Sequence, residues 1–278
     1  MLPVVLVLQL FYFLAAQPGS PRPSQIQVMV EDRDGNPVAG LLATDFDVTN
    51  GKMKCATLSV SQEDQPITVG ILVDTSASMR HTIGDGRPLR DAVKSFMESG
   101  HPNNTYFLAQ FATDVKLLLD FSQDHQKVME ALPRSCGYGS LLFQALEACH
   151  KKLNEREGRK ALLVISDGSD ISGRPLGPVL EALEIPIMGL CPMVPGDDFE
   201  PQSSQLAQIC EATGGKFRQE IRLGKEAGKM AALLRASYSL RLDCGTIPQL
   251  GLKLSIKRNT AKARTRILYS RRLPPTMP

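Results

Sequence analysis

The sequence predicts an α/β protein, with a doubly wound, mostly parallel sheet and a small flanking β module. Two continuous apolar runs, at residues 69–73 and 161–165, are typical of strands buried on both faces. Amphipathic helical patterns separate such runs, and this alternation favours a parallel sheet covered by helices on both sides. Stretches of alternating apolar and polar residues precede and follow this central region, and they predict the flanking module.

The first 25 residues predict a leader and a linker. Residues 2–16 are apolar and end in small residues, as a secretory signal peptide does. We therefore expect a signal peptide at 1–16, a Pro-rich linker at 17–25 and an exported protein that is periplasmic, envelope-bound or secreted. A buried N-terminal strand is the alternative. No apolar run reaches the length of a membrane-spanning helix, so we expect no transmembrane span.

The N-terminal β segment, expected over residues 26–65, contains two turn signals. Apolar residues alternate with polar ones over 26–30, before an Asp-Gly-Asn-Pro turn at 34–37. A second alternating stretch at 46–48 leads into Asn50-Gly51, which is a strong hairpin signal, and the strand pattern then resumes.

The central domain, expected over residues 66–236, consists of strands that alternate with helices. The expected strands are 69–73, 106–111, 115–121, 161–165 and 185–190. The expected helices share apolar stripes at helical spacing, within residues 89–97, 142–153, 176–183, 206–210 and 225–236.

The C-terminal segment, residues 237–278, returns to a β pattern and is expected to join the N-terminal strands in one module. The chain has six cysteines, an even number in an exported chain, which permits three disulfides in 15 possible connectivities. Cys55 with Cys244 is the first choice, because both lie in the flanking β segments. Cys149 and Cys210 fall on apolar helix faces, where a reduced, buried cysteine is the competing interpretation.

The charge balance argues against nucleic-acid binding. Lys and Arg total 32 against 29 for Asp and Glu, which gives a net charge of +3 rather than a strongly basic protein. Residues 253–272 hold eight basic residues and no acid. We interpret this run as the solvated face of two strands. Weak contact with an anionic polymer or a membrane surface is the alternative.

Both fully apolar strands are followed by an aspartate. The first leads into Asp74, with Ser76 and Ser78 close behind, and the second leads into Asp167. Ligands of open α/β sheets bind at the carboxyl ends of the strands, where the strand order reverses. Carboxylate and hydroxyl oxygens suit Mg²⁺, and an ion held by only two carboxylates can still accept a carboxylate from another molecule.

Asp74-x-Ser76-x-Ser78 after one hydrophobic strand, with Asp167-Gly168 after a later one, resembles the metal-ion-dependent adhesion site of von Willebrand factor A domains. The resemblance covers about residues 67–236 and implies a Rossmann-like fold. The family places a threonine before a helix between the two motifs, and Ser140 in Gly-Tyr-Gly-Ser-Leu-Leu takes that place here. The stretch VEDRDGNPVAGLLATDFDVTNG is similar to the N-terminal β segment of bacterial VWFA-related proteins.

The resemblance implies a Mg²⁺ or Mn²⁺ site with hydroxyl ligands from Ser76, Ser78 and Ser140. Asp74 and Asp167 would bind the metal directly or through water, and an acidic residue of a partner protein would complete the shell. We therefore expect a non-enzymatic, metal-dependent binding or adhesion module. The alternatives are a metal-assisted hydrolase, for which no convincing general base lies near the motifs, and a structural envelope protein with an empty site.

Some residues in and near the two motifs also have simpler structural interpretations. Asp74 and Ser76 could serve as helix N-caps, but capping does not explain Asp167 on the second strand. Asp170 is expected to be a solvated loop acid, and Asp114 a turn residue between two strands.

Overall fold

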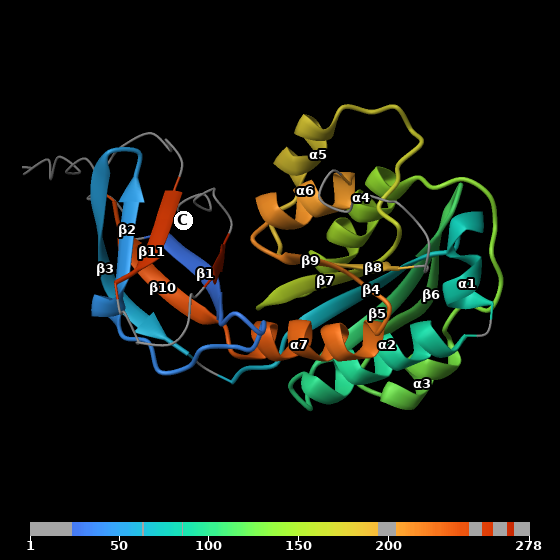
Figure 1. Cartoon of the computed structure of the whole chain (residues 1–278), viewed down its shortest axis with the longest axis horizontal. Coiled ribbons are helices and arrows are strands. Elements are labelled where there is room, and N and C mark those ends of the chain that lie inside the picture. The colour runs from blue at the N-terminus through green and yellow to red at the C-terminus, as the bar shows by residue number, and fades with distance from the viewer. Residues whose placement is uncertain are drawn as a thin grey trace, which may run out of the picture.

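The computed structural model describes residues 24–62, 64–84, 86–193, 204–244, 252–257 and 266–269. Two sheets of six strands each lie side by side, one mostly parallel and flanked by helices, the other antiparallel (Figure 1). The expected signal peptide at 1–16 lies outside the described residues. Part of the expected linker does too, and the first strand begins at Ser24, inside the range assigned to that linker.

The mostly parallel sheet has the order β6-β5-β4-β7-β8-β9, and only β5 and β6 pair antiparallel. Its strands are β4 (Thr68–Asp74), β5 (Thr105–Phe111), β6 (Val115–Ser122), β7 (Lys160–Ile165), β8 (Ile187–Pro192) and β9 (Lys216–Glu220). The two apolar runs form β4 and β7, which are neighbours at the centre of the sheet, and every residue of β4 is buried. The predicted doubly wound α/β fold is confirmed.

Helices cover both faces of this sheet (Figure 1). One face packs against α2 (Arg87–Ser99), α3 (His125–Glu130) and α7 (Leu223–Arg235), and the other against α4 (Leu142–Leu153), α5 (Leu176–Ala182) and α6 (Gln205–Ala212). Successive β4 side chains alternate between the two cores: Val69, Ile71 and Val73 pack with α2 and α7, and Leu72 packs with α4. The short helices are η1 (Ala43–Asp45), η2 (Ala77–Met79) and α1 (Arg80–Ile83).

The antiparallel sheet combines strands from both ends of the described chain, as the sequence predicts. Its order is β11-β2-β3-β10-β1-β12. The strands are β1 (Ser24–Glu31), β2 (Phe46–Asn50), β3 (Met53–Ser61), β10 (Tyr238–Asp243), β11 (Leu252–Ile256) and β12 (Arg266–Tyr269). The β2–β3 hairpin turns at Gly51-Lys52, directly after Asn50, and Gly51 has a φ of 61° that favours glycine.

The predicted disulfide between Cys55 and Cys244 is present and links β3 to the residue that follows β10. Cys136, Cys149 and Cys210 are free thiols. Cys149 and Cys210 are buried on apolar helix faces, and burial raises the pKa of the Cys149 thiol to about 12. Among the helices described, none is long and apolar enough to cross a membrane.

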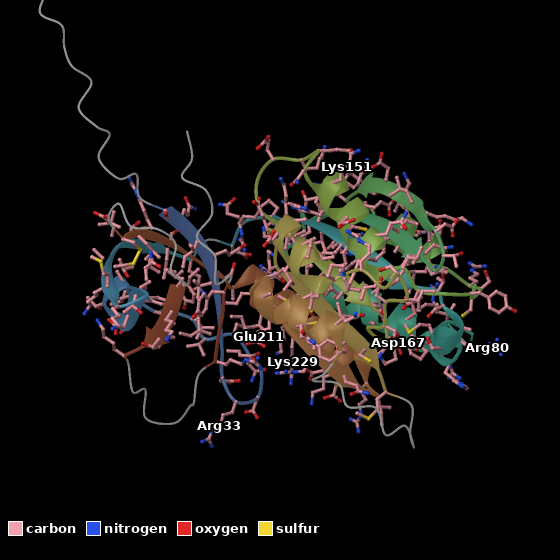
Figure 2. All side chains as sticks on the ribbon, turned by 90° about the horizontal axis from the view of Figure 1, so that it is seen from above. Arg33, Arg80, Lys151, Asp167, Glu211 and Lys229 are labelled. Carbon is pink, nitrogen blue, oxygen red and sulfur yellow. A yellow bond between two sulfur atoms is a disulfide. The ribbon has the colours of Figure 1, made fainter. Side chains whose placement is uncertain are left out.

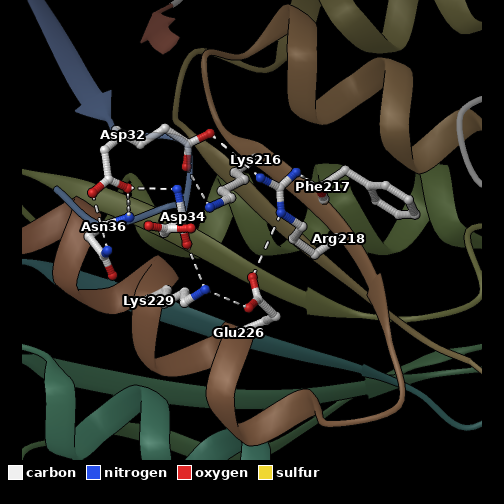
Figure 3. A network of polar contacts seen from close by, with 9 residues as sticks. Asp32, Asp34, Asn36, Lys216, Phe217, Arg218, Glu226 and Lys229 are labelled. Atoms are coloured by element: carbon white, nitrogen blue, oxygen red, sulfur yellow. Dashed lines mark hydrogen bonds and ion pairs between the residues drawn. The ribbon is translucent and has the colours of Figure 1, made fainter. Parts of the chain in front are cut away.

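A buried ion pair joins the two sheets. Glu31, at the end of β1, accepts a hydrogen bond from Lys216, at the start of β9, with Oε2 and Nζ 2.5 Å apart and both side chains almost fully buried (Figure 3). Arg218 lies 3.6 Å from Glu31 and 3.7 Å from Glu226 of α7. Lys229 of α7 pairs with Glu226 at 3.1 Å and donates to the carbonyl of Asp34. These contacts attach the flanking module to β9 and α7.

Candidate metal centre

The candidate site lies at the carboxyl edge of the parallel sheet, between β4 and β7. The two strands are adjacent and parallel, with Val73 opposite Ile165. The chain passes from β4 to β5 on one side and from β7 to β8 on the other, so the strand order reverses between them. Because ligands of open α/β sheets bind at such reversals, Asp74 at the end of β4 and Asp167 just after β7 are well placed for a ligand.

Asp74 is fully buried and accepts three hydrogen bonds. Its Oδ1 accepts from the backbone N–H of Ser76 at 2.8 Å, and its Oδ2 accepts from the hydroxyl of Ser166 at 2.6 Å and more weakly from that of Ser140 at 3.3 Å, which also donates to the Ser169 carbonyl at 2.8 Å. Burial raises the pKa of Asp74, and the nearby negative charge of Asp167 raises it further, while the bonds from Ser166 and Ser76 oppose the shift. A cation beside Asp74 would therefore relieve an unfavourable buried charge.

The two serines of the first motif connect Asp74 to the second aspartate. The Oγ atoms of Ser76 and Ser78 lie 3.0 Å apart, and the Ser78 hydroxyl donates to Oδ2 of Asp167 at 2.5 Å. Ser76 occupies the N-cap position of η2, but its hydroxyl makes no capping hydrogen bond. Its side chain therefore contributes to the polar cluster rather than to the helix end.

The Ser140 loop is held against the other two loops of the site by backbone hydrogen bonds. The N–H of Gly137 donates to the Thr75 carbonyl at 2.6 Å, and the N–H of Ile171 donates to the Ser140 carbonyl at 2.9 Å. Gly139 has a φ of 73°, and a Cβ there would stand 2.7 Å from a methyl group of Thr113. The Ser140 hydroxyl thus reaches Asp74 from a loop whose path is fixed.

One residue of the site, Ser166, was not predicted from the sequence. Ser166, the residue before Asp167, is fully buried, and its hydroxyl donates to Asp74 and accepts from the N–H of Gly168. A serine that ends an apolar strand is the only sequence signal for this role.

The expectation for Asp170 was wrong, whereas that for Asp114 is confirmed. Asp170 is half-buried rather than solvated: it accepts from the N–H of Phe143 at 3.0 Å and from both the backbone and the hydroxyl of Ser172. It therefore joins the loop after Asp167 to the first turn of α4. Asp114 is exposed in the turn between β5 and β6, as expected.

The donor set fits a small divalent cation. The structure brings Asp74, Ser76, Ser78, Ser140 and Asp167 into one cluster whose hydrogen-bonded oxygens are 2.5–3.3 Å apart. Neighbouring oxygens around an octahedral Mg²⁺ lie about 3 Å apart, given metal–oxygen distances of about 2.0–2.1 Å. Neither aspartate pairs with a Lys, Arg or His within the described ranges. These ranges also contain no group of three or more His, Cys, Asp or Glu suited to a metal, so an ion here would depend on serine hydroxyls.

The fold is that of a doubly wound α/β domain, and the polar cluster lies at its strand-order reversal. Residues 69–169 match the family model of the von Willebrand factor type A domain, and this range includes all five clustered side chains. This part of the chain is therefore similar to the von Willebrand factor type A domain. A comparison with the curated proteins found no match.

Solved structures support the same fold. A von Willebrand factor type A protein from Catenulispora acidiphila is 13% identical, with a TM-score of 0.54 over 91% of this chain and 75% of that one. Proximal thread matrix protein 1 from the mussel byssus is 17% identical, with a TM-score of 0.50 over 63% of this chain and 50% of that one. The first likeness extends across most of this chain.

Proposed function

We propose that the protein is an exported, non-enzymatic binding module that holds Mg²⁺ or Mn²⁺ and binds an acidic residue of a partner protein through that ion. The observation that carries the proposal is the cluster of two carboxylates and three serine hydroxyls at the strand-order reversal, without a pairing cation among the described residues. Domains of this family are typically protein-interaction modules, which agrees with a partner that is itself a protein.

Each side chain of the cluster has a distinct role in the proposal. Asp74 and Asp167 would supply the two negative charges that balance a divalent ion, and Ser76, Ser78 and Ser140 would supply neutral oxygens. When bound, the ion supplies a Lewis-acidic position for a carboxylate of the partner. Ser166 positions Asp74 by its 2.6 Å hydrogen bond, and Asp170 positions the loop that follows Asp167.

Export is supported by two independent features. A disulfide such as Cys55–Cys244 persists in oxidising compartments and is rare in the reducing cytosol. Residues 1–16 have the apolar core and small terminal residues of a signal peptide. Both features favour a partner in the envelope or outside the cell.

Binding to an immobilised carboxylate tests the proposed function. We expect the protein to bind a surface coated with the peptide Gly-Gly-Asp-Gly-Gly in Mn²⁺ and to be released by EDTA. The matched amide peptide Gly-Gly-Asn-Gly-Gly should bind at least about tenfold more weakly, and so should the Ser140→Ala variant on the acidic peptide. Asp91→Ala, on the exposed side of α2, is the control and should bind like the wild type.

Binding that survives EDTA, or that is equal for the aspartate and asparagine peptides, would contradict a metal-bridged carboxylate. Interferometry gives both the amplitude and the dissociation rate of each complex. The dissociation rate is the more informative quantity, since most affinity differences between related complexes lie in it.

A further inference from the structure

An exposed apolar pair stands beside the candidate metal centre. Eight large hydrophobic side chains of the described part are exposed, and the most exposed is Tyr138, at 82%, in the loop that carries Ser140. Ile171, at 63%, lies in the loop that follows Asp167. Two others, Met193 and Ile221, come directly after the parallel strands β8 and β9. Half of the eight therefore lie in loops at the edge of the sheet that carries the metal centre.

Tyr138 and Ile171 are held next to the cluster by the loops that carry its ligands. The N–H of Ile171 donates to the carbonyl of Ser140 at 2.9 Å, so the two loops run side by side. A Cβ on Gly139 would be 3.1 Å from Cδ1 of Ile171, which places the isoleucine side chain against the residue between Tyr138 and Ser140. Because these loops are fixed by backbone hydrogen bonds, the pair could be buried by a partner with little further loss of conformational entropy.

Two exposed arginines lie close in the sequence to residues of the candidate metal centre. Arg80 begins α1, two residues after Ser78, and Arg134 precedes the Ser140 loop; both are exposed, and neither forms an ion pair with an acid of the described segments. Burial raises the pKa of the Cys136 thiol, while the positive charge of Arg80 lowers it and the negative charge of Asp74 raises it further. Arg80 and Asp167 lie at the same end of the α/β domain (Figure 2). A partner segment that binds at this edge would therefore meet both positive charge and exposed apolar side chains.

We infer that the partner segment is acidic and apolar together: an aspartate or glutamate directed to the metal centre, with a neighbouring apolar side chain that packs on Tyr138 and Ile171. The inference rests on the proposed function and specifies its partner. Charge complementarity with Arg80 and Arg134 favours an acidic segment over a neutral one. Exposed tyrosine on a rigid loop is a typical anchor of protein interfaces, because it buries much area at low cost in side-chain entropy.

Three immobilised peptides test the inference on the full-length protein in Mn²⁺: Gly-Leu-Asp-Leu-Gly, Gly-Ser-Asp-Ser-Gly and Gly-Leu-Asn-Leu-Gly. We expect the wild type to bind the leucine–aspartate peptide about tenfold more tightly than the serine–aspartate peptide. The double variant Tyr138→Ser, Ile171→Ser should bind both aspartate peptides equally and should retain Mn²⁺ binding by calorimetry. Met53→Ser with Leu58→Ser, which replaces two exposed apolar side chains of β3, is the matched control and should keep the preference.

The outcomes separate the two proposals. Equal binding of the two aspartate peptides by the wild type, with the asparagine peptide rejected, would overturn the apolar anchor and leave the metal-bridged carboxylate intact. A preference that persists in the Tyr138→Ser, Ile171→Ser variant would overturn the assignment to these side chains. Equal binding of the aspartate and asparagine peptides, or binding of none of the three, would overturn both proposals.

Discussion

Replacing Glu31 by alanine is expected to lower the free energy of unfolding by about 3–5 kcal/mol, because it leaves the Lys216 ammonium buried without its acid. Lys216 and Glu31 are only 1% and 2% exposed, and their charged atoms are 2.5 Å apart. Burial lowers the pKa of Lys216 even with Glu31 in place, so the lysine depends on this partner to remain charged. Arg218, 3.6 Å from Glu31, would lose the same partner.

Denaturant unfolding gives the free energy of unfolding of Glu31→Ala, and a variant of an exposed Glu–Lys pair serves as the comparison. Glu98 and Lys94 are 3.8 Å apart on α2 with side chains 59% and 62% exposed, and Glu98→Ala should cost less than about 0.5 kcal/mol. The double variant Glu31→Ala, Lys216→Met should recover much of the loss, since it removes the unpaired charge. If Glu31→Ala were no more destabilising than Glu98→Ala, the buried pair would not hold the two sheets together.

Removing the disulfide is expected to lower the free energy of unfolding about as much as replacing Glu31 does. Cys55 and Cys244 are 189 residues apart, and the loop that they close contains the whole parallel sheet and its helices. In the chain-entropy model a loop of this length stabilises the fold by roughly 5 kcal/mol, and measured values for native bridges are about 2–5 kcal/mol. We expect the Cys55→Ser, Cys244→Ser double variant to lose stability within that range.

Guanidinium unfolding of the double serine variant checks this prediction. Cys136→Ser is the matched control, because Cys136 is a free, half-buried thiol and its replacement removes no covalent link. The double serine variant should unfold at a lower guanidinium concentration than the wild type, and Cys136→Ser should unfold close to the wild-type midpoint. Identical midpoints for the double serine variant and the wild type would show that pairing of β3 with β10 holds the module together without the covalent link.

The elements that the sequence predicts best are those buried on both faces. Residues 69–73 and 161–165 are continuous apolar runs, and they form the central strands β4 and β7. Strand β9 was not predicted, because its sequence, Lys-Phe-Arg-Gln-Glu, is short and mostly polar. It forms through pairing with β8 at the sheet edge and through the ion pair of Lys216 with Glu31, and neither partner is near it in the sequence.

The sequence predicts the part of the candidate site that lies at the ends of the two buried strands. Asp74 and Asp167 each lie at the carboxyl end of a buried strand, and parallel neighbours bring those ends together. Ser140 came from the family resemblance alone. Ser166 and Asp170 were missed because their roles depend on how three loops meet: one hydroxyl points at Asp74, and one carboxylate reaches the N–H of Phe143.

Calorimetric titration of Mn²⁺ into the metal-free protein tests the central claim most directly. We predict one ion bound per wild-type chain, none by Asp74→Asn, and normal binding by Asp91→Asn on the surface of α2. At a free Mn²⁺ concentration of about 100 times Kd, the free energy of unfolding of the wild type should rise by about 2.7 kcal/mol, whereas that of Asp74→Asn should not change. In EDTA, Asp74→Asn should be at least as stable as the wild type, because it removes a buried charge. Equal heats for the wild type and Asp74→Asn would contradict a metal centre at this edge of the sheet.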